Sequence, residues 1–179
     1  MRSILARYLG VKPAEVEFQY SAYGKPRLAP TFEASGLHFN LSHSAEMAMV
    51  AIADREVGAD IERPHPISSM ARLVERFFAA EEYDEWQRLS ADVQQLGFFQ
   101  AWTRKEAWLK ATGSGLSFPL NQVRVSLAPG EPARFVSIGG DPAQAAAWWL
   151  ESCEPAPGYL AAIAMRGEPT RIERWQWRL

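Results

Sequence analysis

Two carboxylates stand at alternate positions near the middle of the chain. Asp60 and Glu62 lie in "REVGADIER", residues 55–63, which alternates as a half-buried strand does. Their side chains therefore project from the same face as Gly58. Two carboxylates this close repel each other unless a proton or a cation lies between them. Such oxygen ligands, completed by substrate phosphate and water, suit magnesium, and a solvated strand face is the alternative.

A second charged group follows in "FFQAWTRKEAWLKATGSGL", residues 98–116. Glu106 and Lys110 are four residues apart and share one face of the predicted helix. Taken alone, they predict a surface ion pair worth roughly 0.3–0.5 kcal/mol. Taken with the acidic strand, Glu106 would be the third carboxylate of a metal site. Lys105 and Lys110 would then offer positive charge to a phosphorylated ligand.

Two shorter motifs have weaker signals. In "NLSHS", residues 40–44, Ser42 and His43 are neighbours on a predicted strand, so they point to opposite faces and do not form a nucleophile–base pair. No G-x-S-x-G sequence surrounds Ser42. A phosphate-binding role, through Ser42 and the His43 imidazole, fits better, and a structural turn is the alternative. Lys25, in "GKP", is uninformative by itself.

Hydrophobic periodicity and turn residues predict the elements that position these groups. Helices are expected at 2–9, 70–78, 81–89 and 94–112, the last closed by Gly113 and Gly115. Strands are expected at 14–20, 38–41, 47–53 and 55–63, with a loop at 23–30. After the long helix, an antiparallel sheet is expected from segments 122–127, 133–138, 146–153, 159–165 and 172–177.

The composition narrows the class of protein. Hydrophobic residues make up 47% of the 179 residues and charged residues 22%, as in a globular domain. A net charge of −2 gives no overall field for nucleic acid. One cysteine, Cys153, excludes an internal disulfide and a cysteine zinc site. Arg2 and Arg7 interrupt the first apolar run, and no apolar segment is long enough to span a membrane. We expect a cytoplasmic protein that binds neither nucleic acid nor membrane.

Taken together and in order, the motifs resemble the 4′-phosphopantetheinyl transferases of the Sfp type. The matching segments are "YGKP" (23–26), "FNLSHS" (39–44), "VGADIE" (57–62), "RFFAAEEY" (76–83), "WTRKEAWLKATGSGL" (102–116) and "PGYLAAIA" (157–164). The resemblance implies one α+β transferase domain over residues 1–179. Two similar subdomains, approximately 1–65 and 66–179, would be related by a pseudo-twofold axis, with the active site between them.

The implied reaction transfers 4′-phosphopantetheine from coenzyme A to a serine of an apo acyl or peptidyl carrier protein, releasing 3′,5′-adenosine bisphosphate. By resemblance, the magnesium ligands are Asp60, Glu62 and Glu106. Glu106 is also the expected general base, and Lys110 is expected to stabilise the leaving group. The expected coenzyme A contacts are Lys25, Pro26, Ser42, His43, Asp60, Lys105 and Lys110.

The chain departs from the family at its start, because residue 1 aligns inside the helix that follows the usual N-terminal segment. The N-terminal subdomain is therefore expected to be incomplete, and an upstream-extended version is expected to bind coenzyme A more tightly. Three other functions stay open: a non-catalytic binder of coenzyme A or carrier, a magnesium-dependent phosphohydrolase, and an interaction protein. Dependence on a carrier distinguishes the transferase from the hydrolase.

Overall fold

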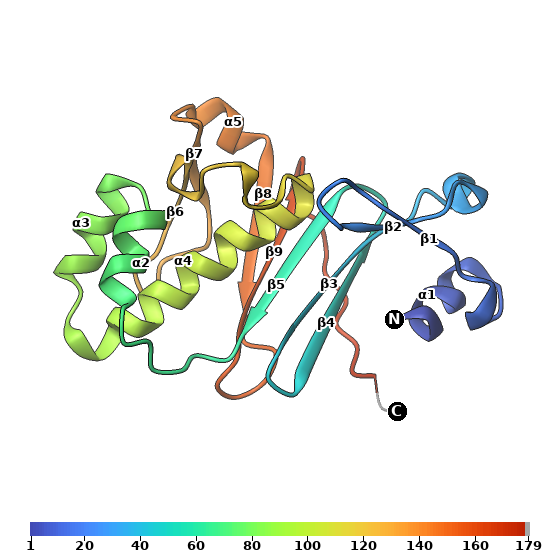
Figure 1. The fold of residues 1–179 in the computed structure, drawn as a ribbon, viewed down its shortest axis with the longest axis horizontal. Coiled ribbons are helices and arrows are strands. Elements are labelled where there is room, and N and C mark those ends of the chain that lie inside the picture. The colour runs from blue at the N-terminus through green and yellow to red at the C-terminus, as the bar shows by residue number, and fades with distance from the viewer. Residues whose placement is uncertain (178–179) are drawn as a thin grey trace.

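The computed structural model describes residues 1–177, with helices and strands in an α+β arrangement (Figure 1). Helix α1, Arg2–Leu9, ends at Gly10, whose φ of 68° is the left-handed conformation that glycine adopts without strain. Two antiparallel hairpins follow: β1 (Phe18–Tyr20) with β2 (Pro26–Leu28), and β3 (His38–Ser44) with β4 (Met47–Ala53).

A three-stranded antiparallel sheet forms the centre of the molecule. Its order is β5 (Val57–Glu62), β9 (Leu160–Arg166) and β8 (Trp148–Cys153). In Figure 1, β3 and β4 continue beside β5, on the side away from β9. A separate pair, β6 (Val123–Val125) and β7 (Phe135–Ile138), lies across α4 from this sheet and leads into the short helix α5, Pro142–Ala146.

Side chains, not backbone carbonyls, join β3 to β5. Alternate residues of β3 supply oxygen acceptors to alternate backbone N–H groups of the neighbouring segment. The pairs are Asn40 with Ala59, Ser42 with Ile61, and Ser44 with Arg63, at 2.9, 3.3 and 3.1 Å. The spacing of two along both strands keeps the register constant. The N-x-S-x-S pattern of β3 therefore extends the central sheet by a strand.

The long helix α4, Ala91–Thr112, crosses β5 and β9. Gly58 permits this close approach, because a Cβ atom there would lie 2.0 Å from Ala107 O and 2.2 Å from Ala111 N. Backbone atoms of a helix cannot move aside as the end of a side chain can. The other helices, α2 (Met70–Phe77) and α3 (Ala80–Arg88), pack near the N-terminal half of α4.

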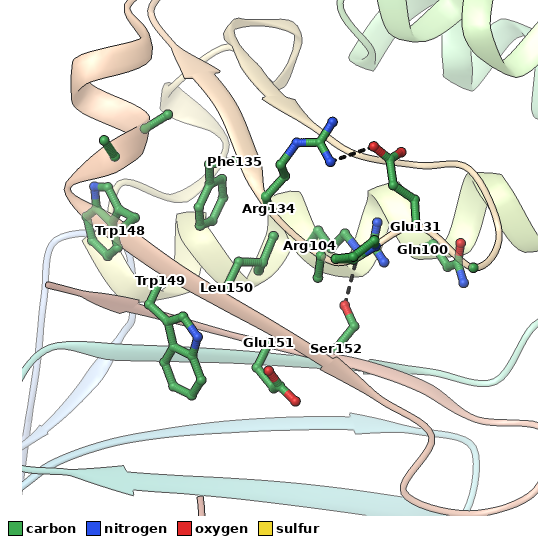
Figure 2. Close-up of a pocket in the computed structure, with 15 residues that line it drawn as sticks. Gln100, Arg104, Glu131, Arg134, Phe135, Trp148, Trp149, Leu150, Glu151 and Ser152 are labelled. Atoms are coloured by element: carbon green, nitrogen blue, oxygen red, sulfur yellow. Dashed lines mark hydrogen bonds and ion pairs between the residues drawn. The ribbon is translucent and has the colours of Figure 1, made fainter. Parts of the chain in front are cut away.

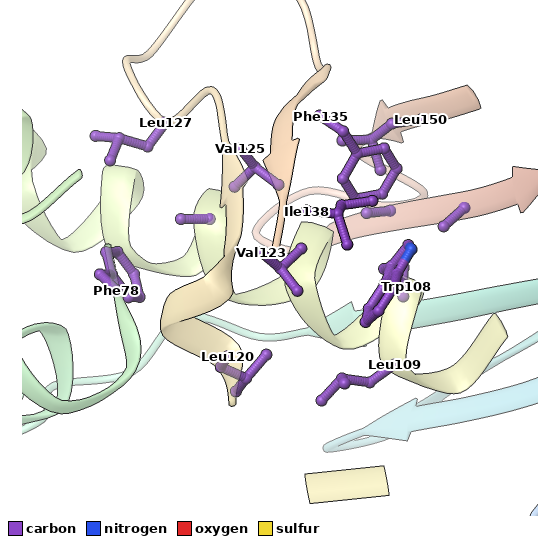
Figure 3. Close-up of a cluster of buried hydrophobic side chains, with 14 of the residues drawn as sticks. Phe78, Trp108, Leu109, Leu120, Val123, Val125, Leu127, Phe135, Ile138 and Leu150 are labelled. Atoms are coloured by element: carbon purple, nitrogen blue, oxygen red, sulfur yellow. The ribbon is translucent and has the colours of Figure 1, made fainter. Parts of the chain in front are cut away.

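The main hydrophobic core lies between α4, the β6–β7 pair and β8 (Figure 3). Trp108 is at its centre, with its ring edge-on to those of Phe118 and Trp148 at 5.0 and 5.9 Å between centroids. Because α4 has protein on most of its sides, its buried positions include charged as well as apolar residues. Because α4 is largely buried, its charged residues are candidates for structural ion pairs or for the functional site.

Most predicted elements are confirmed, and the errors fall in short segments. The expected strand at 14–20 is a 3₁₀ turn, Pro13–Glu15, followed by β1, and the expected loop at 23–30 contains β2. Residues 172–177 form no strand, and α5 was not anticipated. The expected C-terminal sheet is divided between two sheets. Short strands are decided by their pairing partners, which periodicity does not reveal.

The boundary predicted after residue 65 falls in the loop between β5 and α2. The halves share a sheet, because β5 from the first pairs with β9 from the second. Equivalence of the two halves by a pseudo-twofold axis stays a prediction. Within residues 1–177, no helix is long and apolar enough to cross a bilayer.

Candidate active site

Asp60 is a buried carboxylate whose two oxygens have different surroundings. Its side chain is only 3% exposed, so the alternative of a solvated strand face is wrong for this residue. Oδ1 accepts hydrogen bonds from Ser42 Oγ at 2.9 Å and Lys110 Nζ at 2.6 Å. Oδ2 is buried without a partner in the part of the chain that the structure describes. Burial raises the pKa of Asp60, against the opposing effect of Lys110.

The serines of β3 orient both carboxylates of β5. Ser44 Oγ donates to Glu62 Oε2 at 2.7 Å, as Ser42 donates to Asp60. Each hydroxyl also accepts the N–H that follows its carboxylate, from Ile61 and from Arg63. Ser44 was missed by sequence reasoning, although the matched alternation of S-x-S with D-x-E could have indicated it.

Lys110 reaches across from α4 to β5. Its ammonium donates to Asp60 and, at 2.8 Å, to Ser42 Oγ. No ion pair joins it to Glu106 among the described residues, so the simple helix-surface pair is not formed. The Ser42 hydroxyl has thereby one acceptor and two donors as partners, its full capacity. Ser42 belongs to the carboxylate cluster.

Glu106 lies beside the same cluster, one turn of α4 before Lys110. Burial raises its pKa to about 7, and the negative charges of Asp60 and Glu62 act in the same direction, whereas Lys110 opposes them. A carboxyl with a pKa near neutrality exchanges a proton readily at physiological pH. Of the three carboxylates expected from the sequence, the two on β5 are therefore close enough to the one on α4 to affect its pKa.

The cluster matches a hard cation in donor type. The buried, unpaired Oδ2 of Asp60 is an oxygen donor that lacks a partner, and cation binding would relieve the repulsion between the carboxylates. As the side chains lie, however, no three His, Cys, Asp or Glu groups within residues 1–177 are arranged to hold a metal ion. Lys110 instead provides the positive charge at Oδ1 of Asp60.

The predicted contact of Lys105 with phosphate is wrong. Lys105 is 0% exposed, and its ammonium donates to Glu82 Oε2 at 2.6 Å and to the carbonyl oxygens of Leu120 and Val123. All three of its N–H donors are therefore used inside the core. Glu82 is equally buried and also accepts from the Ala79 and Val125 N–H groups. Lys105 ties α4 to α3 and to the segment that leads into β6.

The remaining predicted contacts lie on the N-terminal hairpins. Lys25 donates to Ala111 O at 2.7 Å, satisfying a carbonyl at the C-terminal end of α4. Lys25 and Pro26 both line a pocket of about 360 Å³ between the first hairpin and His38. His43 is exposed, on the opposite face of β3 from the buried Ser42, which agrees with the predicted alternation.

Two curated relatives match nearly the whole chain. The chain is 40% identical over 178 residues to the 4′-phosphopantetheinyl transferase HetI of Nostoc sp. (strain PCC 7120), covering 99% of this chain and 72% of the relative. It is 32% identical over 164 residues to the 4′-phosphopantetheinyl transferase Sfp of Bacillus subtilis, covering 91% of this chain and 69% of the relative.

One solved structure is weakly similar, and one family model matches more than half of the chain. The crystal structure of the Thermotoga maritima holo-[acyl-carrier-protein] synthase is similar with a TM-score of 0.45, at 14% identity over 64% of each chain. The family model of the 4′-phosphopantetheinyl transferase superfamily matches residues 56–164, from the start of β5 through α4 to β9. The chain therefore belongs to the 4′-phosphopantetheinyl transferase superfamily.

Proposed function

We propose that this chain transfers 4′-phosphopantetheine from coenzyme A to a serine hydroxyl of an apo acyl or peptidyl carrier protein. One observation carries the proposal: the buried carboxylate of Asp60 has one oxygen held by Ser42 and Lys110 and one without a partner. Glu106 is close enough to this carboxylate for its pKa to be raised by it. The proposed general base, Glu106, thus lies near the Asp60 carboxylate, whose unpaired oxygen could bind a cation.

Asp60, Glu62 and Glu106 would hold a magnesium ion by their carboxylate oxygens. The ion would neutralise negative charge on the pyrophosphate of coenzyme A. Ser42 and Ser44 would keep Asp60 and Glu62 oriented toward it, because each hydroxyl is itself fixed by a backbone N–H. Asn40 holds the same two strands in register through the Ala59 N–H.

The transfer itself needs a base and a group that stabilises the leaving phosphate. The carrier serine oxygen forms a bond to the phosphorus of the pantetheine side, and the bond from that phosphorus to the bridging oxygen breaks. Glu106 accepts the proton of the serine hydroxyl. Lys110 stabilises the charge on the departing 3′,5′-adenosine bisphosphate, for which it would exchange its contact with Asp60.

The pocket beside Lys25 and Pro26 is the proposed place of the adenosine end. Its volume of about 360 Å³ lies in the range of small-molecule sites. Arg27 and His38 also line it, together with Glu56, which pairs with Arg27 at 4.0 Å. Arg27 would supply positive charge for a phosphate if it exchanged this exposed pair for the ligand. His43, exposed on β3, is the proposed second contact for the 3′-phosphate. The carrier, magnesium and a cytoplasmic location stay predictions.

Intact-protein mass spectrometry of an apo carrier protein, incubated with this chain and coenzyme A, tests the proposal. We expect a mass gain of one phosphopantetheine that requires both the chain and magnesium. Release of 3′,5′-adenosine bisphosphate without any carrier would instead indicate the hydrolase. No mass gain across acyl and peptidyl carriers, with coenzyme A binding intact by calorimetry, would indicate the non-catalytic binder.

A further inference from the structure

A second pocket lies on the far side of α4 from the carboxylate cluster. It has a volume of about 610 Å³, and its lining residues come from α4, from 130–135 and from 145–152. On α4 it is lined by Gln100 and Arg104, one turn apart. At 100° per residue, Arg104 and Glu106 project roughly 200° apart, so the helix itself separates the two sites. The volume is in the range of small-molecule sites.

One end of this pocket is polar (Figure 2). Arg104 is 2% exposed, with Nε donating to Ser152 Oγ at 3.1 Å and Nη1 to Ser126 O at 2.6 Å. Nη1 also donates to Ser126 Oγ, whereas Nη2 has no acceptor among the described residues. The Oε1 atom of Gln100 is buried and also lacks a partner in residues 1–177. The polar end therefore offers one unused donor to a ligand, Nη2 of Arg104.

The charge of Arg104 is not neutralised by a direct ion pair. Burial lowers its pKa to about 10, which leaves the guanidinium charged at neutral pH. The other pocket arginine, Arg134, pairs with Glu131 at 2.6 Å, and Glu151 pairs with Arg174 at 3.8 Å. No carboxylate pairs with Arg104 in the described part of the chain. With Glu131 and Glu151 also on the lining, a monoanion fits better than a dianion.

The other end is apolar and aromatic. Figure 2 shows Phe135, Trp148 and Leu150 on the side of β8 that faces Arg104, whereas Trp149 lies on the other side of that strand. Trp148 is held edge-on against the core residue Trp108, so this wall is preformed. Aromatic faces of this kind favour a flat ring in an offset or edge-on arrangement.

We propose that this pocket binds a small aromatic monocarboxylate, whose carboxylate accepts from Nη2 of Arg104 and whose ring lies against Phe135 and Trp148. Since Nε and Nη1 are already committed to Ser152 and Ser126, the carboxylate binds end-on at Nη2. The site is separate from the proposed coenzyme A site and does not depend on transfer activity.

Tryptophan indole N–H signals in ¹H–¹⁵N spectra test the site, with naphthalene-2-carboxylate as the probe. We expect a saturable shift of the Trp148 signal but not of the Trp149 signal, because Trp149 lies on the other face of β8. Single Trp→Phe substitutions assign the two signals. The neutral analogue 2-naphthalenemethanol should bind roughly tenfold more weakly or worse, because it lacks the charge-assisted hydrogen bond. Inorganic phosphate should leave both signals in place. Equal affinity for acid and alcohol, or tighter binding of phosphate, would overturn the proposal.

Single substitutions in the pocket test where the probe binds. Arg104→Gln should weaken binding of the acid roughly tenfold and leave that of the alcohol unchanged. Because Arg104 also bridges Ser126 and Ser152, Trp148→Leu is a second test that leaves those bonds intact, and it should weaken both ligands. The control Glu106→Gln, on the opposite face of α4, should change neither. Displacement of the probe by coenzyme A, or unchanged affinity in Arg104→Gln and Trp148→Leu, would refute the site.

Discussion

Lys110 Nζ lies 2.6 Å from Asp60 Oδ1 and thereby joins α4 to β5 at the carboxylate cluster. This ammonium partly offsets the burial of Asp60, while Oδ2 of the same carboxylate lacks a partner in the described chain. The arrangement keeps a buried negative charge ready for a cation without leaving it wholly uncompensated.

Replacing Glu106 with glutamine should remove most of the transfer activity. The change deletes the proposed base and a ligand charge together while keeping the shape of the side chain. A loss of roughly 100-fold or more in kcat is expected, the scale of general-base contributions. Carrier modification followed by mass spectrometry measures it, with Glu75→Gln on the exposed side of α2 as the matched control. Near-normal turnover in Glu106→Gln would remove Glu106 from the role of base.

Lys110→Ala should lower kcat more than it weakens binding of coenzyme A. If the ammonium acts on charge that develops as the phosphate leaves, its loss affects the transition state, on the order of 10²-fold. Binding of coenzyme A by calorimetry and transfer kinetics together separate the two effects. The exposed Lys12→Ala is the control. An effect on KM alone, with kcat intact, would place Lys110 among the binding residues.

The raised pKa of Glu106 makes stability depend on pH in metal-free buffer. Between about pH 4.5 and 7 the folded state keeps a proton that the unfolded state has released. This contribution to stability is therefore present at low pH and is lost as the pH rises through about 7. As the pH is raised from 5.5 to 8, the unaltered chain should lose stability relative to Glu106→Gln. Urea unfolding with EDTA at both pH values measures this, and a pH-independent difference would contradict the assigned pKa.

Lys105→Met should destabilise the fold and leave coenzyme A binding nearly unchanged. Removal of Lys105 leaves Glu82 as an unpaired charge at 0% exposure, and breaking a buried pair costs about 3–5 kcal/mol. Urea unfolding gives the stability, and calorimetry at low temperature gives the dissociation constant of coenzyme A. A large loss of affinity in folded Lys105→Met would restore the phosphate role that its burial contradicts.

Gly58→Ala should separate α4 from β5. The added Cβ would meet backbone atoms of Ala107 and Ala111 at 2.0 and 2.2 Å, and overpacking of this kind costs typically 1–3 kcal/mol or more. Gly97→Ala, within α4, is the control, because its only close approach would be to the movable Leu89 Cδ1 at 2.5 Å, with Leu127 at ordinary contact distance. Transfer activity should fall along with stability in Gly58→Ala, since Asp60 and Glu106 sit on the two separated elements. Equal stability of both variants would disprove this role for Gly58.

Local sequence signals were sufficient for the helices and for the acidic residues of the site. The four predicted helices and the strand with Asp60 and Glu62 all form, because periodicity and glycine stops act over a few residues. The same signals were insufficient for β2 and for residues 172–177. Pairing with a partner strand decides whether such short segments become strands.

The spacing of Asp60 with Glu62 and of Glu106 with Lys110 can be read directly from the chain, and it indicates the type of chemistry. Which lysine serves the site depends on how the elements pack together. Helix geometry separates Lys105 from Lys110 by roughly 140°, but it does not say which face meets the core. Lys105 pairs with Glu82 on α3 and is therefore part of the core, whereas Lys110 pairs with Asp60 on β5. A buried charge needs a partner, and that partner comes from another element of the fold.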